Sequence, residues 1–364
     1  MMADGLNGAT ILLTLSKPEF PNHRKIKRSI HSEMAGYPSY SVQDANEVVI
    51  NGNLAADTAL GLSSIPKFLL PKYFYDDRGS AIFREIMNMP GYYLTACEYE
   101  ILLEHSASIA AHLSEGASFL NILEPGAGDG SKTVLLLKAM VNAGIDFRFV
   151  PVDISNEANE VLRDTIIAEL PEADVRPLTG DYFHMFNSSE INPGERNVII
   201  FLGSNIGNLN NNELHLFLQN ISDYTLRGDK LLIGFDLKKS PSVIMKAYDD
   251  PYGLTRKFNL NHLLRLNNEL HADFDVSLFE HHTYYNPVSG ELKSFLVSTA
   301  EQHIHIGAIG DTFTIGQWEP LFMEMSRKFD LHALESIAIS HGFRIVKNFT
   351  DRRNWFVDSL WTRT

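Results

Sequence analysis

The stretch Ile122-Leu-Glu-Pro-Gly-Ala-Gly-Asp-Gly-Ser-Lys-Thr133 decides the fold, because it joins a strand to a helix through a glycine-rich turn. Residues 119–123 are mostly apolar and predict a buried strand, and residues 133–140 have the pattern of an amphipathic helix. Gly126, Gly128 and Gly130 allow positive φ and let a ligand approach the backbone without a Cβ in the way. The segment therefore predicts the first unit of a nucleotide-type binding fold.

The residues around this turn suit a sulfonium nucleoside better than a dinucleotide. A dinucleotide fingerprint requires Gly or Ala three residues after Gly128, and Ser131 occupies that position. Glu124 before the first glycine and Asp153 at the end of the next apolar segment are carboxylates that match ribose hydroxyls and a positive centre. The pattern therefore disfavours NAD and favours S-adenosylmethionine.

Strand and helix patterns alternate through the middle of the chain, which indicates a parallel, doubly wound α/β sheet. The predicted strands are residues 119–123, 147–153, 174–180, 197–202 and 230–235. After a predicted helix over 331–341, segments 343–350 and 355–361 face each other across a turn and predict an antiparallel hairpin. Such a hairpin closes one edge of class I methyltransferase sheets, so we expect that Rossmann-like fold.

Four regions are expected along the chain. Residues 1–54 have little periodicity and predict an N-terminal extension. Residues 55–240 hold a helical part and the cofactor-binding core, and residues 331–364 complete the core sheet. Between them, residues 241–330 combine a helical piece with strands at 278–285 and 291–306, which predicts a small α+β lobe that binds the substrate.

Composition and charge narrow the class of protein. With 364 residues, 44% of them hydrophobic, the chain can bury one large core or two moderate ones. The formal net charge of −14 disfavours nucleic acid and anionic membrane as partners. There is no apolar run of ~18 residues and no secretory-signal pattern, and Cys97, the single cysteine, excludes an internal disulfide. We therefore expect a cytoplasmic monomer that acts on a small molecule.

The fourteen histidines raise the question of a metal site. His303 and His305 alternate along a predicted strand, which places both rings on one face, and His281 and His282 are expected on the partner strand. No third ligand is evident, and methyl transfer from a sulfonium requires no metal. We predict that the protein binds no metal.

Seven short motifs resemble, in the same order, those of the histidine-specific, S-adenosylmethionine-dependent Nα-methyltransferases that open ergothioneine biosynthesis. The most specific are Phe201-Leu-Gly-Ser-Asn-Ile-Gly-Asn208 and Glu324-Met-Ser-Arg-Lys-Phe329, and the others are residues 71–76, 90–95, 124–133, 247–250 and 272–275. The resemblance covers about residue 55 to 364. It implies an enzyme that methylates the amino group of L-histidine to give Nα,Nα,Nα-trimethylhistidine (hercynine), with S-adenosylhomocysteine as the second product.

The resemblance assigns cofactor-binding roles to five residues. It implies that Gly126 and Lys132 line the turn, that Asp153 binds the ribose, and that Asp181 and Tyr182 lie beside the adenine. A carboxylate accepts hydrogen bonds from ribose hydroxyls or from an adenine amino group, so these residue types suit the roles. Gly-Asp is also a common turn pair, and the assignment of Asp181 therefore depends on the resemblance.

The resemblance also implies a substrate site over the carboxyl ends of the strands, roofed by the lobe. Asn208 and Tyr248 would bind the carboxylate of the amino acid, and Glu324 and Ser326 would bind its imidazole. Tyr92 would lie near the amine as the catalytic residue, where it accepts a hydrogen bond without serving as a strong base. The walls would be completed by Tyr75, Phe83 and Gly203.

One position departs from the family pattern. Where the family commonly has a methionine in the pocket strand, this chain has Ser294, which we also place in the substrate site. The pocket is therefore expected to be wider or more polar. A tryptophan derivative, such as the prenylated tryptophan methylated by a related branch, is the alternative acceptor. A non-catalytic S-adenosylmethionine-binding protein is the other alternative, and it is disfavoured because Asn208, Tyr248, Glu324 and Ser326 are all present.

Overall fold

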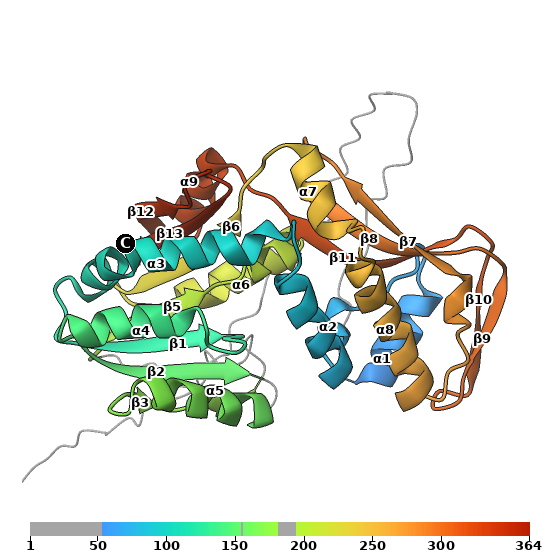
Figure 1. Ribbon diagram of the computed structural model, residues 1–364, viewed down its shortest axis with the longest axis horizontal. Helices are drawn as coiled ribbons and strands as arrows, with labels where there is room; N and C mark the ends of the chain where they lie inside the picture. The colour runs from blue at the N-terminus through green and yellow to red at the C-terminus, as the bar shows by residue number, and fades with distance from the viewer. Residues whose placement is uncertain (1–52, 154–155, 181–193) are drawn as a thin grey trace, which may run out of the picture. The chain divides into compact units, whose positions relative to one another are not determined.

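The core of the protein is an eight-stranded sheet with the order β12-β13-β6-β5-β1-β2-β3, in which β4 also pairs with β2. The computed structural model describes residues 53–153, 156–180 and 194–364 (Figure 1). The paired strands among β1 to β6 are parallel, and β13 is antiparallel to both β6 and β12. This arrangement confirms the predicted doubly wound sheet with a closing hairpin. The strands are β1 (Phe119–Pro125), β2 (Asp146–Asp153), β3 (Asp174–Val175), β4 (Leu178–Thr179), β5 (Arg196–Phe201), β6 (Lys230–Asp236), β12 (Phe343–Thr350) and β13 (Phe356–Arg363).

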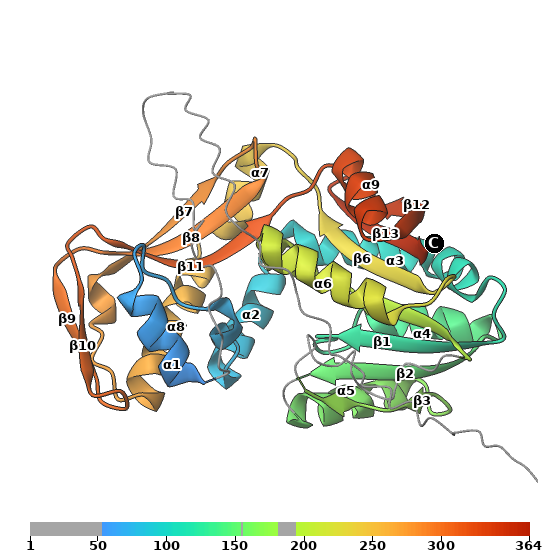
Figure 2. The ribbon, with the colours of Figure 1, turned by 180° about the vertical axis from the view of Figure 1, so that it is seen from behind.

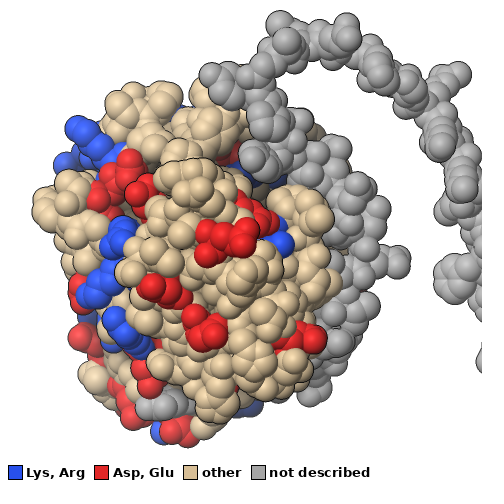
Figure 3. Space-filling model, turned by 90° about the vertical axis from the view of Figure 1, so that its right-hand side faces the viewer, with Lys and Arg blue, Asp and Glu red and all other residues tan. Residues whose placement is uncertain are grey.

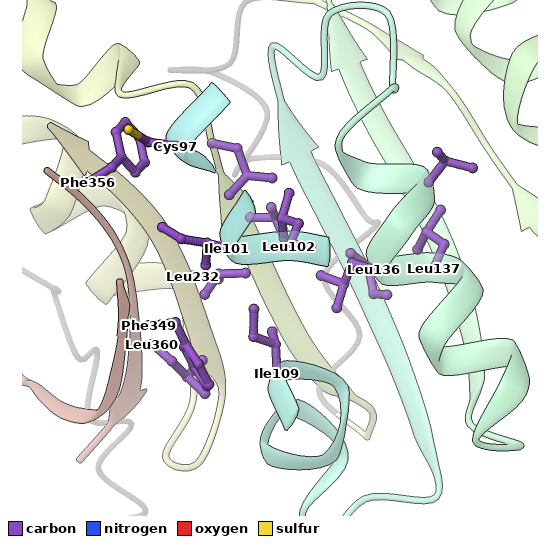
Figure 4. Packing of buried hydrophobic residues seen from close by; sticks show 14 of the residues in the cluster. Cys97, Ile101, Leu102, Ile109, Leu136, Leu137, Leu232, Phe349, Phe356 and Leu360 are labelled. Carbon is purple, nitrogen blue, oxygen red and sulfur yellow. The ribbon is translucent and has the colours of Figure 1, made fainter. Parts of the chain in front are cut away.

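Helices cover both faces of this sheet. On one face lie α3 (Tyr93–Ser114), α4 (Thr133–Asn142) and α5 (Asn156–Glu169), and on the other lie α6 (Asn211–Tyr224) and α9 (Leu331–Ser340). Figure 4 shows Ile101 and Leu102 of α3 close to Leu232 of β6 and Leu136 of α4, and all four side chains are fully buried. Burying a leucine or isoleucine contributes about 1.5–3 kcal/mol, so this packing anchors α3 firmly on the sheet.

The lobe contains two small antiparallel sheets, β11-β8-β7 and β10-β9, beside two helices. The predicted strand over 291–306 is wrong as a single strand, because it is divided between the two sheets. His303 and His305 therefore pair with β10, where their rings contact Thr314 and Thr312, and not with the strand that holds His281. The elements are α7 (Pro241–Tyr248), α8 (Leu254–Glu269), η4 (Val276–Leu278), β7 (Phe279–Tyr285), β8 (Glu291–Ser298), β9 (Gln302–Ile306), β10 (Asp311–Ile315) and β11 (Pro320–Arg327).

The first helices of the described chain pack on the lobe. They are α1 (Leu54–Ser63), the 3-10 helix η1 (Pro71–Phe74) and α2 (Asp77–Met87), and Figure 2 shows α1 and α2 beside α8. Their buried side chains share one hydrophobic cluster with α8 and the lobe strands. Phe74 stacks on Phe258 of α8 with ring centroids 4.7 Å apart. The lobe is therefore built from segments that precede the core in the sequence and segments that follow it.

The lobe joins the core through β11 and the 3-10 helix η3 (Asn205–Asn208). The backbone N–H of Phe329 donates to the carbonyl of Asp236, and that of Lys238 donates to the carbonyl of Phe329. A Cβ on Gly207 would lie 2.8 Å from the carbonyl oxygen of Arg327, so only glycine permits this close approach. The contact brings the end of β11 against the carboxyl ends of β5 and β6.

The surface carries charges of both signs. Figure 3 shows Lys and Arg side chains interspersed with Asp and Glu on one face of the molecule. Among the described residues, no helix combines the length and apolar character needed to cross a membrane.

Candidate active site

The glycine turn after β1 is open to a ligand. Gly126, Gly128 and Gly130 adopt φ values of +65°, +63° and +71°, a region that favours glycine. Apart from the chain neighbours, no atom of the described residues lies within 4 Å of a Cβ built on Gly126 or Gly128, whereas a Cβ on Gly130 would lie 2.3 Å from Leu162 of α5. The first two glycines therefore leave space beside the turn, and the third permits helix packing.

Asp153 lies next to this turn because β1 and β2 are adjacent parallel strands. Pro125 pairs with Val152, and the N–H of Gly126 donates to the carbonyl of Val152 over 2.8 Å. Asp153, the last residue of β2, is half-buried, and its carbonyl accepts from the N–H of Gly180. The predicted cofactor residues Asp181 and Tyr182 lie outside the described residues.

Lys132 links the turn to a buried acid. Its ammonium donates to Glu98 of α3 over 2.6 Å, and Glu98 also accepts from the N–H of Gly203 over 2.7 Å. Burial opposes the charge of Lys132, but Glu98 and Glu124 outweigh it and raise the pKa of Lys132 above its ordinary value. Lys132 therefore carries a positive charge between the glycine turn and the segment that follows β5.

A cavity lies between this edge of the core and the lobe elements. Its residues come from α2, the start of α3, the segment after β5, α7, α8 and β11. Aromatic rings form one wall, with the Tyr75 and Phe83 centroids 5.5 Å apart and those of Tyr92 and Tyr248 6.2 Å apart. The cavity is lined by Tyr75, Phe83, Ile86, Tyr92, Leu94, Gly203, Ser204, Asn205, Asn208, Ala247, Tyr248, Thr255, Phe258, Glu324 and Ser326.

Hydroxyl and amide groups form a second wall of the cavity. The Tyr248 hydroxyl lies 2.9 Å from Ser326 Oγ, and the ammonium of Lys328 donates to both oxygens over 2.8 and 2.7 Å. Asn208, at the end of η3, lines the same cavity, because Gly207 lets β11 pass close to this turn. Burial raises the pKa of Tyr248 well above its usual value, so its hydroxyl keeps its proton.

Glu324 is the carboxyl group among the residues that line the cavity. Burial raises the pKa of Glu324 to about 7, although Lys328 nearby lowers it. The carboxyl is therefore able to hold or release a proton near neutral pH. Burial also raises the pKa of Tyr92 well above its usual value, so Tyr92 stays protonated and is no strong base.

The structure brings together all but one of the residues predicted for the substrate site. Tyr75, Phe83, Tyr92, Gly203, Asn208, Tyr248, Glu324 and Ser326 all line the cavity. Ser294 lies outside this lining. It pairs with Glu324 across β8 and β11, is fully buried, and its hydroxyl has no hydrogen-bond partner among the described residues. Because cross-strand partners share a face of the sheet, its predicted influence on the pocket would act through the neighbouring Glu324.

Sequence reasoning missed several residues of this site. Ser204, Asn205 and Ala247 lie inside quoted motifs and were not singled out, whereas Thr255 and Phe258 of α8 belong to no motif. Asp236 ends an apolar strand just as Asp153 does, and that signal could have identified it. The described residues include no group of three or more His, Cys, Asp or Glu that could hold a metal ion.

The fold and the cavity define a class of enzyme. A sheet of this order, with antiparallel β13 between β6 and β12 and an open glycine turn after β1, is that of a class I S-adenosylmethionine-dependent methyltransferase. Residues 54–363 match the family described as histidine-specific, S-adenosylmethionine-dependent methyltransferases, and the chain belongs to that family. S-adenosylmethionine is therefore its methyl donor, and the open turn and the carboxylate of Asp153 suit its nucleoside.

Named relatives span more than one acceptor. The histidine N-alpha-methyltransferase of Mycobacterium tuberculosis is 34% identical over 84% of this chain and 94% of that protein. Ergothioneine biosynthesis protein 1 of Schizosaccharomyces pombe is 30% identical over 67% of this chain and 32% of that protein. The 4-dimethylallyltryptophan N-methyltransferase of Claviceps fusiformis is 26% identical over 80% of this chain and 87% of that protein.

Proposed function

We propose that the protein is an L-histidine Nα-methyltransferase that forms hercynine for ergothioneine biosynthesis. One observation carries the proposal. Among the described residues, the cavity combines neutral polar groups, Asn208, Tyr248 and Ser326, with the carboxyl group of Glu324. Neutral donors suit the carboxylate of an amino acid, and a carboxyl group suits the N–H of an imidazole. Family membership and the similarity to histidine N-alpha-methyltransferases support the same substrate.

In this proposal the residues position the amino acid and perform no covalent chemistry. The amide of Asn208 and the hydroxyl of Tyr248 donate to the carboxylate, and Glu324 and Ser326 hold the ring. Tyr92, which remains protonated, accepts a hydrogen bond from the amine and orients its lone pair. Holding the reacting atoms in line contributes up to about 7–11 kcal/mol to lowering the barrier.

The reaction forms one bond and breaks one. S-adenosylmethionine supplies an electrophilic methyl group on its sulfonium. The lone pair of the neutral amine forms the new N–C bond, and the electrons of the S–C bond pass to sulfur. After the first and second transfers an N–H proton leaves to solvent, whereas the third transfer leaves a quaternary ammonium. For the cofactor, Gly126 leaves room beside the turn, Asp153 accepts from the ribose and Lys132 holds Glu98 against the turn. The roles of Asp181 and Tyr182 beside the adenine remain predictions.

A tryptophan derivative is the alternative acceptor. The similarity to a 4-dimethylallyltryptophan N-methyltransferase and the aromatic wall of Tyr75, Phe83 and Phe258 favour a bulky ring. Glu324, whose carboxyl group is able to hold a proton near neutral pH, and Ser326 together favour imidazole, because imidazole has one nitrogen that donates and one that accepts, whereas indole has one N–H and no ring nitrogen that accepts.

A substrate panel tests the proposal. The purified protein is incubated with S-adenosylmethionine and, separately, L-histidine, histamine, L-tryptophan and 4-dimethylallyltryptophan, and methyl additions are followed by mass spectrometry. We expect successive methylation of L-histidine up to the trimethylated product. Preference for either indole substrate over L-histidine would overturn the proposal in favour of the alternative.

A further inference from the structure

Lys328 is a fully buried lysine directly behind the polar wall of the cavity. Its side chain comes from the segment that follows β11, and its exposed fraction is 0%. Besides Tyr248 and Ser326, its ammonium contacts Asp236 over 2.9 Å. An ammonium has three donors and no acceptor, so these three partners use all of its hydrogen-bonding capacity.

Asp236 is shared among several donors. It accepts from the Tyr93 hydroxyl over 2.8 Å and also pairs with the ammonium of Lys239. Burial lowers the pKa of Lys239, and the nearby Asp236 opposes this effect. Because Asp236 divides its charge between two lysines, it does not fully neutralise Lys328.

The residues that line the cavity in the described part of the chain include no lysine or arginine. Lys328 is one hydroxyl away, since its ammonium donates to the oxygen of Tyr248, a residue that lines the cavity. The acidic side chain among these lining residues is Glu324, which lies on the same β-strand as Ser326. A substrate carboxylate bound at Tyr248 would therefore be one hydroxyl away from the ammonium of Lys328.

The contacts of Lys328 also direct hydroxyl protons. Because its ammonium donates to both Tyr248 and Ser326 and has no acceptor, neither hydroxyl donates to Lys328. One of the two hydroxyls donates to the other across 2.9 Å, which leaves the proton of the second hydroxyl for another acceptor. When a substrate carboxylate accepts a hydrogen bond from the Tyr248 hydroxyl, Ser326 donates to Tyr248, and the Ser326 oxygen is then only an acceptor toward the substrate.

We propose that Lys328 is a positioning residue for carboxylate recognition, which acts through Tyr248. Its charge strengthens the Tyr248 hydroxyl as a donor, and its hydrogen bonds turn the hydroxyl proton toward the cavity. This inference rests on the proposed function, in which the acceptor is an amino acid with a free carboxylate.

The test compares L-histidine with L-histidine amide, which lacks the negative charge but keeps the ring and the amine. The measured quantity is the ratio of kcat/KM for the acid to kcat/KM for the amide. In Lys328→Met we expect this ratio to fall roughly 10- to 100-fold, as expected when a hydrogen bond to a charged group is weakened, mainly through KM for the acid. In the control Lys239→Met, which removes an equal charge from Asp236 but touches neither hydroxyl, we expect a clearly smaller fall, because Lys328 still contacts both hydroxyls while Asp236 neutralises it more fully.

Two further variants keep the test decisive. If Lys328→Met does not fold, as judged by loss of S-adenosylmethionine binding, Lys328→Gln replaces it. The glutamine amide donates to the hydroxyls but carries no charge, so the acid-to-amide ratio should also fall in Lys328→Gln. In a Tyr248→Phe background, Lys328→Met should lower the ratio no further, since the effect passes through the hydroxyl.

The outcomes separate the two hypotheses. A wild-type enzyme that prefers the acid, together with a folded Lys328 variant that keeps the wild-type ratio, would overturn the role of Lys328 and leave the proposed function intact. A wild-type enzyme that methylates acid and amide equally would overturn carboxylate recognition itself. An equal fall in Lys239→Met would also overturn the inference, because it would indicate a purely structural effect.

Discussion

The Glu324→Gln variant should lose stability less steeply than the wild type as pH rises. Burial raises the pKa of Glu324 from its ordinary value of 4.5 to about 7, and Lys328 opposes part of this shift. In the unfolded chain the carboxyl returns to its ordinary pKa. Between these two values the folded protein keeps a proton that the unfolded chain has released.

The sign and size of the effect follow from this difference. Since the folded state binds the extra proton, the free energy of unfolding decreases as pH rises through this window. The stabilising contribution is fully present below pH 4.5 and lost as pH passes about 7. Each pKa unit corresponds to about 1.4 kcal/mol, and the opening of the cavity to water reduces the total, so we expect roughly 1–3 kcal/mol.

Urea denaturation between pH 4.5 and pH 8 measures this contribution. As pH rises, the free energy of unfolding of Glu324→Gln should increase relative to that of the wild type by roughly 1–3 kcal/mol. Glu335→Gln, on the exposed side of α9, is the matched control and should follow the wild-type curve. Parallel curves for Glu324→Gln and the wild type would refute the reasoning, because they would mean that burial does not hold the proton.

Three further predictions concern the cofactor, the acceptor and the junction between core and lobe. Asp153→Asn should weaken S-adenosylmethionine binding roughly 10- to 100-fold in calorimetry, whereas Asp146→Asn at the other end of β2 should not, and equal affinities would contradict the ribose contact. The wild type should methylate L-histidine far better than histamine, and Asn208→Ala should remove most of that preference; similar turnover of the two amines by the wild type would contradict carboxylate recognition. Gly207→Ala should destabilise the protein by roughly 1–3 kcal/mol and raise KM for the acceptor, because its Cβ would lie 2.8 Å from the Arg327 carbonyl. Gly316→Ala, where the nearest atom is 3.6 Å away, is its control, and equal stability of both variants would exclude a tight junction.

The local sequence patterns predicted most of the core sheet, but the predicted strand over 174–180 is wrong as a single strand, because it is divided into β3 and β4. The strands predicted at 119–123, 147–153, 197–202 and 230–235 match β1, β2, β5 and β6 to within two residues, and the hairpin β12–β13 was also found. These elements are buried runs bounded by glycine or polar turns, and such patterns depend on neighbouring residues alone. The glycine turn was recognisable for the same reason.

The lobe was harder to predict because its pairing is not local. Residues 291–306 have one continuous strand pattern, yet the break at 299–301 sends β8 and β9 into different sheets. The β11 strand was missed as a strand, although its motif was recognised. A strand's partner is chosen by the tertiary fold, and alternation along the sequence does not reveal it.

The sequence by itself determined the class of fold, the glycine turn and most of the residue types that line the cavity. Tertiary structure alone decided that Ser294 lies beside Glu324 but outside the lining, and that Thr255 and Phe258 belong to the lining. It also decided that Lys328 is buried against Asp236, Tyr248 and Ser326. The physical reason is that hydrogen bonds and charges act over a few ångströms in space, so residues from β6, α7 and β11 form one network only after the lobe packs on the core.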